Sequence, residues 1–190
     1  MEIFRDSVVV LKAEFNIKNI SRSEEVKVHK VLSSFHSFES AEQVVLQNAF
    51  KIGNHFLALL SVNYLVIRGR QRYTETLTDL EFAGLGKLNV DLKKTFIRRE
   101  TLQDKIQELF IPVEVDFDHN KTFSRKYFVL TNDPQNLKDK MPSKLMDIIN
   151  EQREIEVEIN GRNLLVRNYQ RITQQGALDL AKFLSDLDEV

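Results

Sequence analysis

The clearest pattern of hydrophobic and polar positions in the chain is a strict alternation in the stretch EIEVEINGRNLLV. Ile155, Val157 and Ile159 alternate with glutamates, which is typical of a strand with one buried and one exposed face. Asn160-Gly161 suits the two central positions of a type I′ turn, so we predict an antiparallel β-hairpin whose glutamates face solvent. The predicted pairs are Ile159 with Arg162, Val157 with Leu164, Ile155 with Val166 and Glu154 with Arg167.

Apolar residues at helical spacing recur in the rest of the C-terminal half. Thr101 and Asp104 form a capping-box pattern at the start of one predicted helix. Asp133 precedes Pro134, a residue favoured in the first helical turn, and Ser143 is the predicted cap of a third helix. The last helix is predicted from the apolar residues Ala177, Leu180, Ala181, Leu184 and Leu187, which lie three and four positions apart.

The N-terminal half has a weaker pattern. Val8–Phe15 is predicted to be a strand because of its β-branched residues, and His55–Tyr73 is predicted to be one long strand or a bent pair. Between them we predict a helix capped by Ser40. Its predicted inward residues are Val44, Val45, Phe50 and Ile52.

Strands and helices follow one another without a regular strand–helix–strand rhythm. Two further predicted strands, Val113–Phe117 and Phe123–Thr131, flank a predicted turn at Asp118–Lys121. We therefore predict an α+β fold with a mainly antiparallel sheet, helices packed on one face, and a C-terminal hairpin followed by an amphipathic helix. Residues 1–190 are predicted to form a single domain, with two subdomains divided near residues 84–90 as the alternative.

Composition narrows the class of protein. The chain has 190 residues, a formal net charge of −1 and no cysteine, so thiolate metal sites, disulfides and thiol nucleophiles are excluded. Its most apolar stretch, His55–Ile67, is shorter than the about 20 residues of a membrane-spanning helix, and the N-terminus lacks the pattern of a signal peptide. We therefore expect a cytoplasmic protein without a transmembrane segment; peripheral membrane contact is left open.

The order of elements in the C-terminal half resembles that of a known group. FDHNKTFSRKYFVLTNDP is followed by LKDKMPSKLMDIINEQ, by the hairpin EIEVEINGRNLLV and by a closing amphipathic helix. This arrangement, over roughly residues 95–190, is similar to a family of uncharacterised bacterial and archaeal proteins, members of which often carry transmembrane segments upstream. The resemblance implies no activity and supplies no site residues.

Arg68, Arg70 and Arg72 lie two positions apart, so on a strand they would share one face. Such a row could bind an anionic ligand, either nucleic acid or a lipid headgroup. The near-neutral chain favours the other interpretation, a solvated strand face beside acidic neighbours. The row is nevertheless the only candidate anion-binding site that the sequence offers.

Catalytic and metal-binding patterns are scarce. Gly84 to Lys87, GLGK, lacks the two further loop residues and the hydroxyl of a phosphate-binding loop, so we predict a turn. Alternating carboxylates followed by a histidine form a candidate acid–base or cation site. The same alternation is expected of a strand with one solvent-exposed face. The residues of this candidate site are Glu114, Asp116, Asp118 and His119.

These absences favour binding over catalysis, and we expect no cofactor, no metal and no catalytic residue. The leading hypothesis is a non-catalytic protein–protein interaction module whose partner is another protein or a second copy. The alternatives are anion binding through the arginine row and a hydrolase-type enzyme with an unrecognised site. Phe35 and Phe38 lie in a polar setting and could contact a partner, but we predict that they pack under the sheet.

Overall fold

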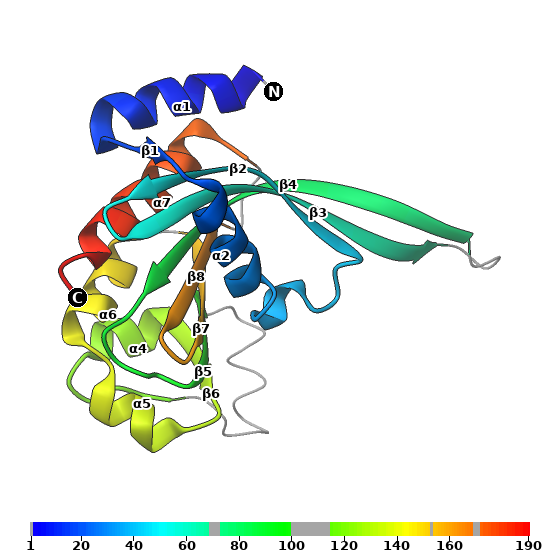
Figure 1. The fold of residues 1–190 in the computed structure, drawn as a ribbon. Coiled ribbons are helices and arrows are strands. Elements are labelled where there is room, and N and C mark those ends of the chain that lie inside the picture. Colours follow the sequence, from blue (N-terminus) through cyan, green and yellow to red (C-terminus); the bar gives the residue numbers. More distant parts are fainter. Residues whose placement is uncertain (1, 69–72, 100–114, 153, 169–171) are drawn as a thin grey trace.

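The fold is a single eight-stranded sheet with helices on both faces (Figure 1). A computed structural model describes residues 2–68, 73–99, 115–152, 154–168 and 172–190. The strand order is β1-β2-β3-β4-β8-β7-β5-β6, and every pair of neighbours is antiparallel. The predicted α+β class with a mainly antiparallel sheet is confirmed.

The described elements have the following bounds. The strands are β1 Lys18–Asn19, β2 Gln43–Ile52, β3 His55–Arg68, β4 Tyr73–Lys87, β5 Lys94–Arg99, β6 Tyr127–Thr131, β7 Ile155–Asn160 and β8 Asn163–Asn168. The helices are α1 Glu2–Phe15, α2 Arg22–Leu32, the 3-10 helix η1 His36–Phe38, α4 Lys121–Lys126, α5 Pro134–Lys140, α6 Ser143–Glu151 and α7 Gln174–Leu187.

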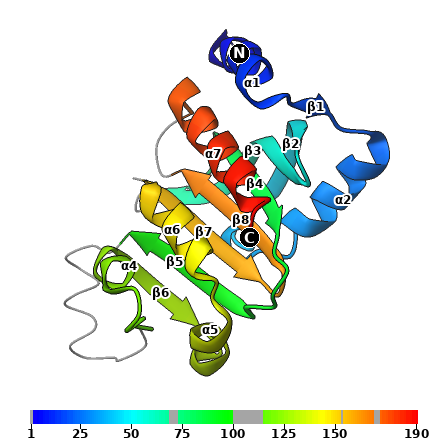
Figure 2. The same cartoon turned by 90° about the vertical axis from the view of Figure 1, so that its left-hand side faces the viewer.

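Each face of the sheet has its own hydrophobic core. The larger core lies between the sheet and helices α1, α4, α5, α6 and α7, and Figure 2 shows α4 to α7 in front of the strands. The smaller core lies on the opposite face, where α2 and the segment leading into η1 cover β3, β4 and β8. Phe35 and Phe38 are buried there, which confirms that they pack against the sheet.

Two glycines in β4 allow the C-terminal helix to pack closely on the sheet. A Cβ on Gly84 would lie 2.6 Å from Val166 Cγ1 of β8 and 3.2 Å from Leu184 Cδ2 of α7, and one on Gly86 would lie 2.4 Å from Leu187 Cδ2 of α7. The prediction of a turn at GLGK is therefore wrong, because these residues belong to β4, where all four pair with β8 and Gly84 and Leu85 also pair with β3. The glycines leave space for α7 and do not reverse the chain.

The C-terminal hairpin forms with the predicted faces but not with the predicted pairs. Ile159 lies opposite Leu164 and Val157 opposite Val166, so the register is shifted by two residues. The turn begins at Gly161, which has φ of +65°, and its backbone is hydrogen-bonded to Leu88, Leu92 and Lys93. A shift of two preserves the side-chain faces, so the same apolar residues still enter the core.

Helix α1 replaces the strand predicted for Val8–Phe15. Ser7 and Leu11, four positions apart, are almost fully buried, whereas Val9 between them is 68% exposed. This is the burial pattern of a helix, not of a strand, in which every second residue is buried. The β-branched run at Val8, Val9 and Val10 was the misleading signal.

Strand β2 replaces the helix predicted after Ser40. A register shift against β3 between Leu46 and Asn48 places an extra residue in the strand, as in a β-bulge. Leu46 and Ala49 thus reach the same core although they are three positions apart. The bulge gives this strand an apolar spacing that resembles that of a helix.

The segment predicted as a strand from Phe123 to Thr131 is divided into two elements. Helix α4 covers Lys121–Lys126, because the Asn120 side chain caps it by accepting a hydrogen bond from the Phe123 amide at 3.1 Å. Strand β6 follows. Residues 115–117 are not in a strand, and the predicted helix at Thr101 and the start of the predicted strand at Val113 lie outside the described residues.

The other helix predictions depend on local signals and are confirmed in position. Asp133 caps α5 by accepting a hydrogen bond from the Asn136 amide at 3.1 Å, and Pro134 is its first residue. Helix α7 buries the five predicted apolar residues. Helix α6 begins at Ser143 but is preceded by Pro142 at the cap position, so the predicted cap at Ser143 is wrong.

Gly53 in the β2–β3 turn is expected to tolerate no side chain. Its φ is +56°, and a Cβ there would lie 1.7 Å from Oδ2 of Asp188, whose Oδ1 accepts hydrogen bonds from the Asn54 amide and side chain. We expect Gly53→Ala to lower the free energy of unfolding by about 2–3 kcal/mol, from backbone strain plus the lost hydrogen bonds. Urea denaturation measures this loss.

Gly161→Ala is the matched control, because Gly161 also has positive φ but the nearest atom to its Cβ lies 4.0 Å away. Strain alone should cost about 1 kcal/mol there. Equal losses at the two positions would show that Asp188 contributes nothing to the turn.

Candidate functional site

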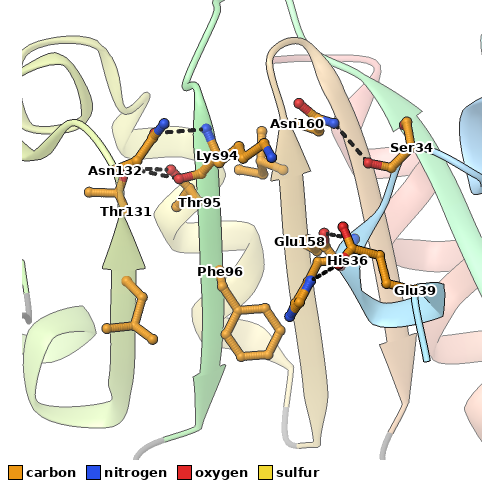
Figure 3. Close-up of a pocket in the computed structure, with 12 residues that line it drawn as sticks. Ser34, His36, Glu39, Lys94, Thr95, Phe96, Thr131, Asn132, Glu158 and Asn160 are labelled. Atoms are coloured by element: carbon orange, nitrogen blue, oxygen red, sulfur yellow. Dashed lines mark hydrogen bonds and ion pairs between the residues drawn. The ribbon is translucent and has the colours of Figure 1, made fainter.

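The segment that follows α2, residues 33–38 including η1, is anchored to strand β7 by the buried Glu158 and by Asn160 (Figure 3). The Glu158 carboxylate accepts hydrogen bonds from the amides of His36 at 2.6 Å and Ser37 at 3.0 Å, and from the Ser37 hydroxyl at 2.6 Å. The Asn160 side chain donates to the Ser34 carbonyl at 2.8 Å. Glu158 is only 8% exposed, so the prediction that the glutamate face of this strand is wet is wrong at this position.

A cavity of about 570 Å³ lies beside this anchored segment, over β5, β6 and β7. Phe96 and Leu130 supply its apolar surface, and His36 and Glu39, 2.7 Å apart, stand at its rim (Figure 3). Both rim side chains are largely exposed. The lining also contains Lys94 and Glu158, so the cavity carries charges of both signs and shows no preference for one class of ligand.

A cluster of charged groups lies next to Glu158 on the same face. Arg167 of β8 pairs with Glu156 of β7 and lies 3.6 Å from Glu81 of β4, and its guanidinium stacks 5.4 Å from the ring centre of Phe38. All three charged side chains are at least three-quarters buried. Burial raises the pKa of Glu81, an effect that Arg167 only partly offsets. The cluster is structural, since it lies beneath η1.

Strands β3 and β4 continue beyond the sheet as a two-stranded arm (Figure 1). Strand β2 pairs with β3 only as far as Asn63, and β8 pairs with β4 only from Ala83 onward. Beyond these points the pairs from Tyr64 with Leu77 to Arg68 with Tyr73 have no third strand among the described residues. Two-stranded ribbons without further packing are marginally stable in water.

Two leucines are exposed on one face, Leu65 in the arm and Leu80 just before it, opposite Ser61, where β2 still pairs with β3. Leu65 is 53% exposed and Leu80 is 49% exposed. The register places both on the face that is buried further along the same strands, at Leu59 and Phe82. The apolar residues of β3 thus continue beyond the part of the strand that other described residues of the chain cover.

A second cavity, of about 290 Å³, lies between α2 and the β3–β4–β8 part of the sheet. Its apolar surface comes mainly from Val31, Phe56 and Leu85, while its polar groups are lysines and asparagine side chains. The described lining contains no carboxylate. The polar lining residues are Lys27, Lys30, Lys87, Asn54 and Asn163.

The buried His55 lies on the other side of β3 from this cavity. Its Nδ1 accepts a hydrogen bond from the Lys87 amide at 3.4 Å, and its Nε2 lies 3.2 Å from Asp188. Burial lowers the pKa of His55, and Asp188 opposes that shift. No hydroxyl nucleophile appears in these contacts, so the pair links the C-terminus to the β2–β3 turn.

The residues singled out in the sequence do not form one site. Arg68 is the last residue of β3, at the end of the arm, whereas Arg70 and Arg72 lie outside the described residues. Asp116, Asp118 and His119 are exposed in the segment before α4, and Glu114 is not described. Within the described ranges no three histidine, aspartate or glutamate side chains lie close enough to hold a metal ion.

Comparison with known proteins does not assign the chain to a family. No family model, no curated protein and no solved structure matches the chain. In the described part of the chain, no helix is both long enough and apolar enough to span a bilayer. Function is therefore argued from the geometry of this molecule alone.

Proposed function

We propose that the protein is a non-catalytic protein–protein interaction module that acts through the β3–β4 arm. The observation that carries the proposal is the exposure of Leu65 on a ribbon without a third strand among the described residues, with Leu80 exposed on the same face just before that ribbon begins. Exposed strand edges bind further strands, because their backbone amide and carbonyl groups have no partner in the isolated chain. The partner that the arm fits best is a second copy of this chain.

The charge along the two edges of the arm favours pairing through β3. Around Leu77 or Thr78, two-fold pairing of β4 edges would set Glu75 opposite Asp79 or Glu81 of the second copy. Like charges directly opposite each other destabilise a sheet. The β3 edge from Tyr64 to Arg68 contains no acid. Antiparallel pairing about Val66 therefore joins two arms without that repulsion.

This geometry predicts a disulfide at one designed position. The chain has no cysteine, so Val66→Cys introduces a single thiol, placed opposite its own copy at the two-fold axis. Directly opposite strand residues lie within the Cα separation that a disulfide requires. We expect mild oxidation to convert this variant into a covalent dimer that dithiothreitol reverses. Non-reducing electrophoresis measures the dimer.

Leu77→Cys is the matched control, because Leu77 lies on β4 opposite Tyr64 within the same arm. Sedimentation equilibrium of the wild type should show a reversible dimer with a Kd on the order of micromolar, since the paired segment is short. A dimer that crosslinks through Leu77→Cys but not Val66→Cys would overturn the β3 pairing. A strict monomer at roughly 500 μM, about five-hundredfold above a Kd of 1 μM, would overturn self-association through the arm.

A further inference from the structure

The cavity between α2 and the sheet combines an apolar floor with a cationic rim. Phe56 and Val31 are half-buried and Leu85 is buried, so a ligand there would contact hydrocarbon and an aromatic ring. Lys27 and Lys30 stand on one side, on the helix, and Lys87 stands on the other, at the end of β4. The rim thus brings positive charge from two separate elements to one opening.

These lysines have no internal counter-charge. Among the described residues, none of the three makes an ion pair with a carboxylate, unlike Lys51, which pairs with Glu24 at 3.1 Å. The carboxylate of Glu24 is committed to Lys51 and to capping α2 at Ser21. Three lysines that line one cavity create a positive potential there, which favours a bound anion.

The amides of the lining add hydrogen-bond capacity. Asn163 reaches the cavity from the start of β8 with N–H donors and a carbonyl acceptor. Asn54 reaches it from the β2–β3 turn, and its side-chain amide already donates one hydrogen bond to Asp188. At about 290 Å³ the cavity is near the lower limit for small-molecule sites. It therefore suits a compact ligand with one ring, not a dinucleotide or a peptide.

From this arrangement we infer that the α2–sheet cavity binds a small organic anion, a phosphate or carboxylate attached to an apolar ring. The ring packs against Phe56 and Leu85, and the anionic group faces Lys27, Lys30 and Lys87. This site is separate from the arm, and its occupancy does not depend on self-association.

Phenyl phosphate is the probe, because it joins one aromatic ring to a dianion. In ¹H–¹⁵N NMR titrations of the full chain we expect it to shift the amides of Asn54, Lys87 and Asn163, with a Kd on the order of 1 mM or tighter. Inorganic phosphate tests the anion alone and benzyl alcohol tests the ring alone. Each should bind at least about tenfold more weakly, since each makes only part of the contacts.

Charge-neutral variants test the role of the rim. The triple change Lys27→Gln, Lys30→Gln and Lys87→Gln should raise the Kd of phenyl phosphate at least about tenfold, and Lys30→Gln alone should raise it by a smaller factor. The control is Lys144→Gln with Lys182→Gln, because these lysines of α6 and α7 already pair with Glu189 and Glu151. This control should leave the Kd unchanged.

Three outcomes would overturn the inference. The first is a wild-type protein whose three reporter amides do not move at 10 mM phenyl phosphate, about ten times the expected Kd. The second is an equal loss of binding in the control variant, which would show only general attraction of anions. The third is benzyl alcohol binding as tightly as phenyl phosphate. If the triple variant does not fold, the Kd of phenyl phosphate for Lys30→Gln and the comparison of the three probes on the wild type still test the inference.

Discussion

Arg167→Met is expected to lower the free energy of unfolding by about 3–5 kcal/mol, the range observed when one partner of a buried ion pair is removed. Arg167 contacts Glu156 and Glu81, and its own side chain is 18% exposed. Methionine fills much of the volume but leaves two carboxylates in a region that water barely reaches. Urea denaturation at pH 7 measures the loss.

The loss should depend on pH in a defined direction. Burial already raises the pKa of Glu81, and removal of the guanidinium raises it further. A carboxyl whose folded-state pKa lies above its unfolded value destabilises the fold once pH rises above that unfolded value. The difference between wild type and Arg167→Met should therefore narrow as pH falls from 7 towards 4.5.

Lys182→Met is the control, because the pair of Lys182 with Glu151 is more than half exposed on both sides. Removal of such a pair costs at most about 1 kcal/mol. If Arg167→Met costs no more than Lys182→Met, the cluster is not an essential part of the fold. A pH-independent difference between wild type and Arg167→Met would show that packing, not charge, explains the loss.

Local signals explain why the C-terminal half was the easier part to predict. Asp133 followed by Pro134 specifies a helix start within a few residues, and α7 needs only an apolar stripe at helical spacing. The hairpin faces follow from alternation, but its register does not. Contacts of Gly161 and Arg162 with the β4–β5 connection accompany the observed turn, and they join residues about seventy positions apart.

The N-terminal half was mispredicted because its decisive features are not local. The bulge in β2 exists only in relation to β3, and α1 is buried on one side by packing against α7 and the sheet. Propensity predicts Val8–Val10 as a strand, and tertiary packing overrides it. The same applies to Gly84 and Gly86. Their sequence predicts a turn, whereas their role depends on the packing of α7 against β4.

The candidate sites were largely invisible in the sequence for a related reason. The alternation of Glu154, Glu156 and Glu158 is the same whether that face is wet or covered by η1. Nor does the spacing of Lys27 and Lys30 reveal that Lys87 stands opposite them. The apolar composition of β3 does not reveal that Leu65 is exposed, and that exposure is the basis for proposing a partner.

Glu158→Ala is expected to lower the free energy of unfolding by about 2–4 kcal/mol, because it leaves the amides of His36 and Ser37 without their charged acceptor, a residue that is only 8% exposed. Glu158→Gln keeps one acceptor oxygen and should lose about half as much. The control is Glu154→Ala, in the same glutamate row but without a hydrogen bond to the α2–η1 segment among the described contacts. It should change the free energy by less than about 0.5 kcal/mol.

Hydrogen exchange distinguishes this anchor from a general packing role. In Glu158→Ala the amides of His36 and Ser37 should exchange at least about tenfold faster, since they lose a charge-assisted hydrogen bond, while the buried amides of β7 keep their order of protection. Unchanged exchange at His36 and Ser37 would show that Phe35 and Phe38 hold the segment without the carboxylate. Because Phe38 also covers Arg167, release of the segment would admit water to the charge cluster and couple the two substitutions. The double variant should then lose less stability than the sum of the single losses.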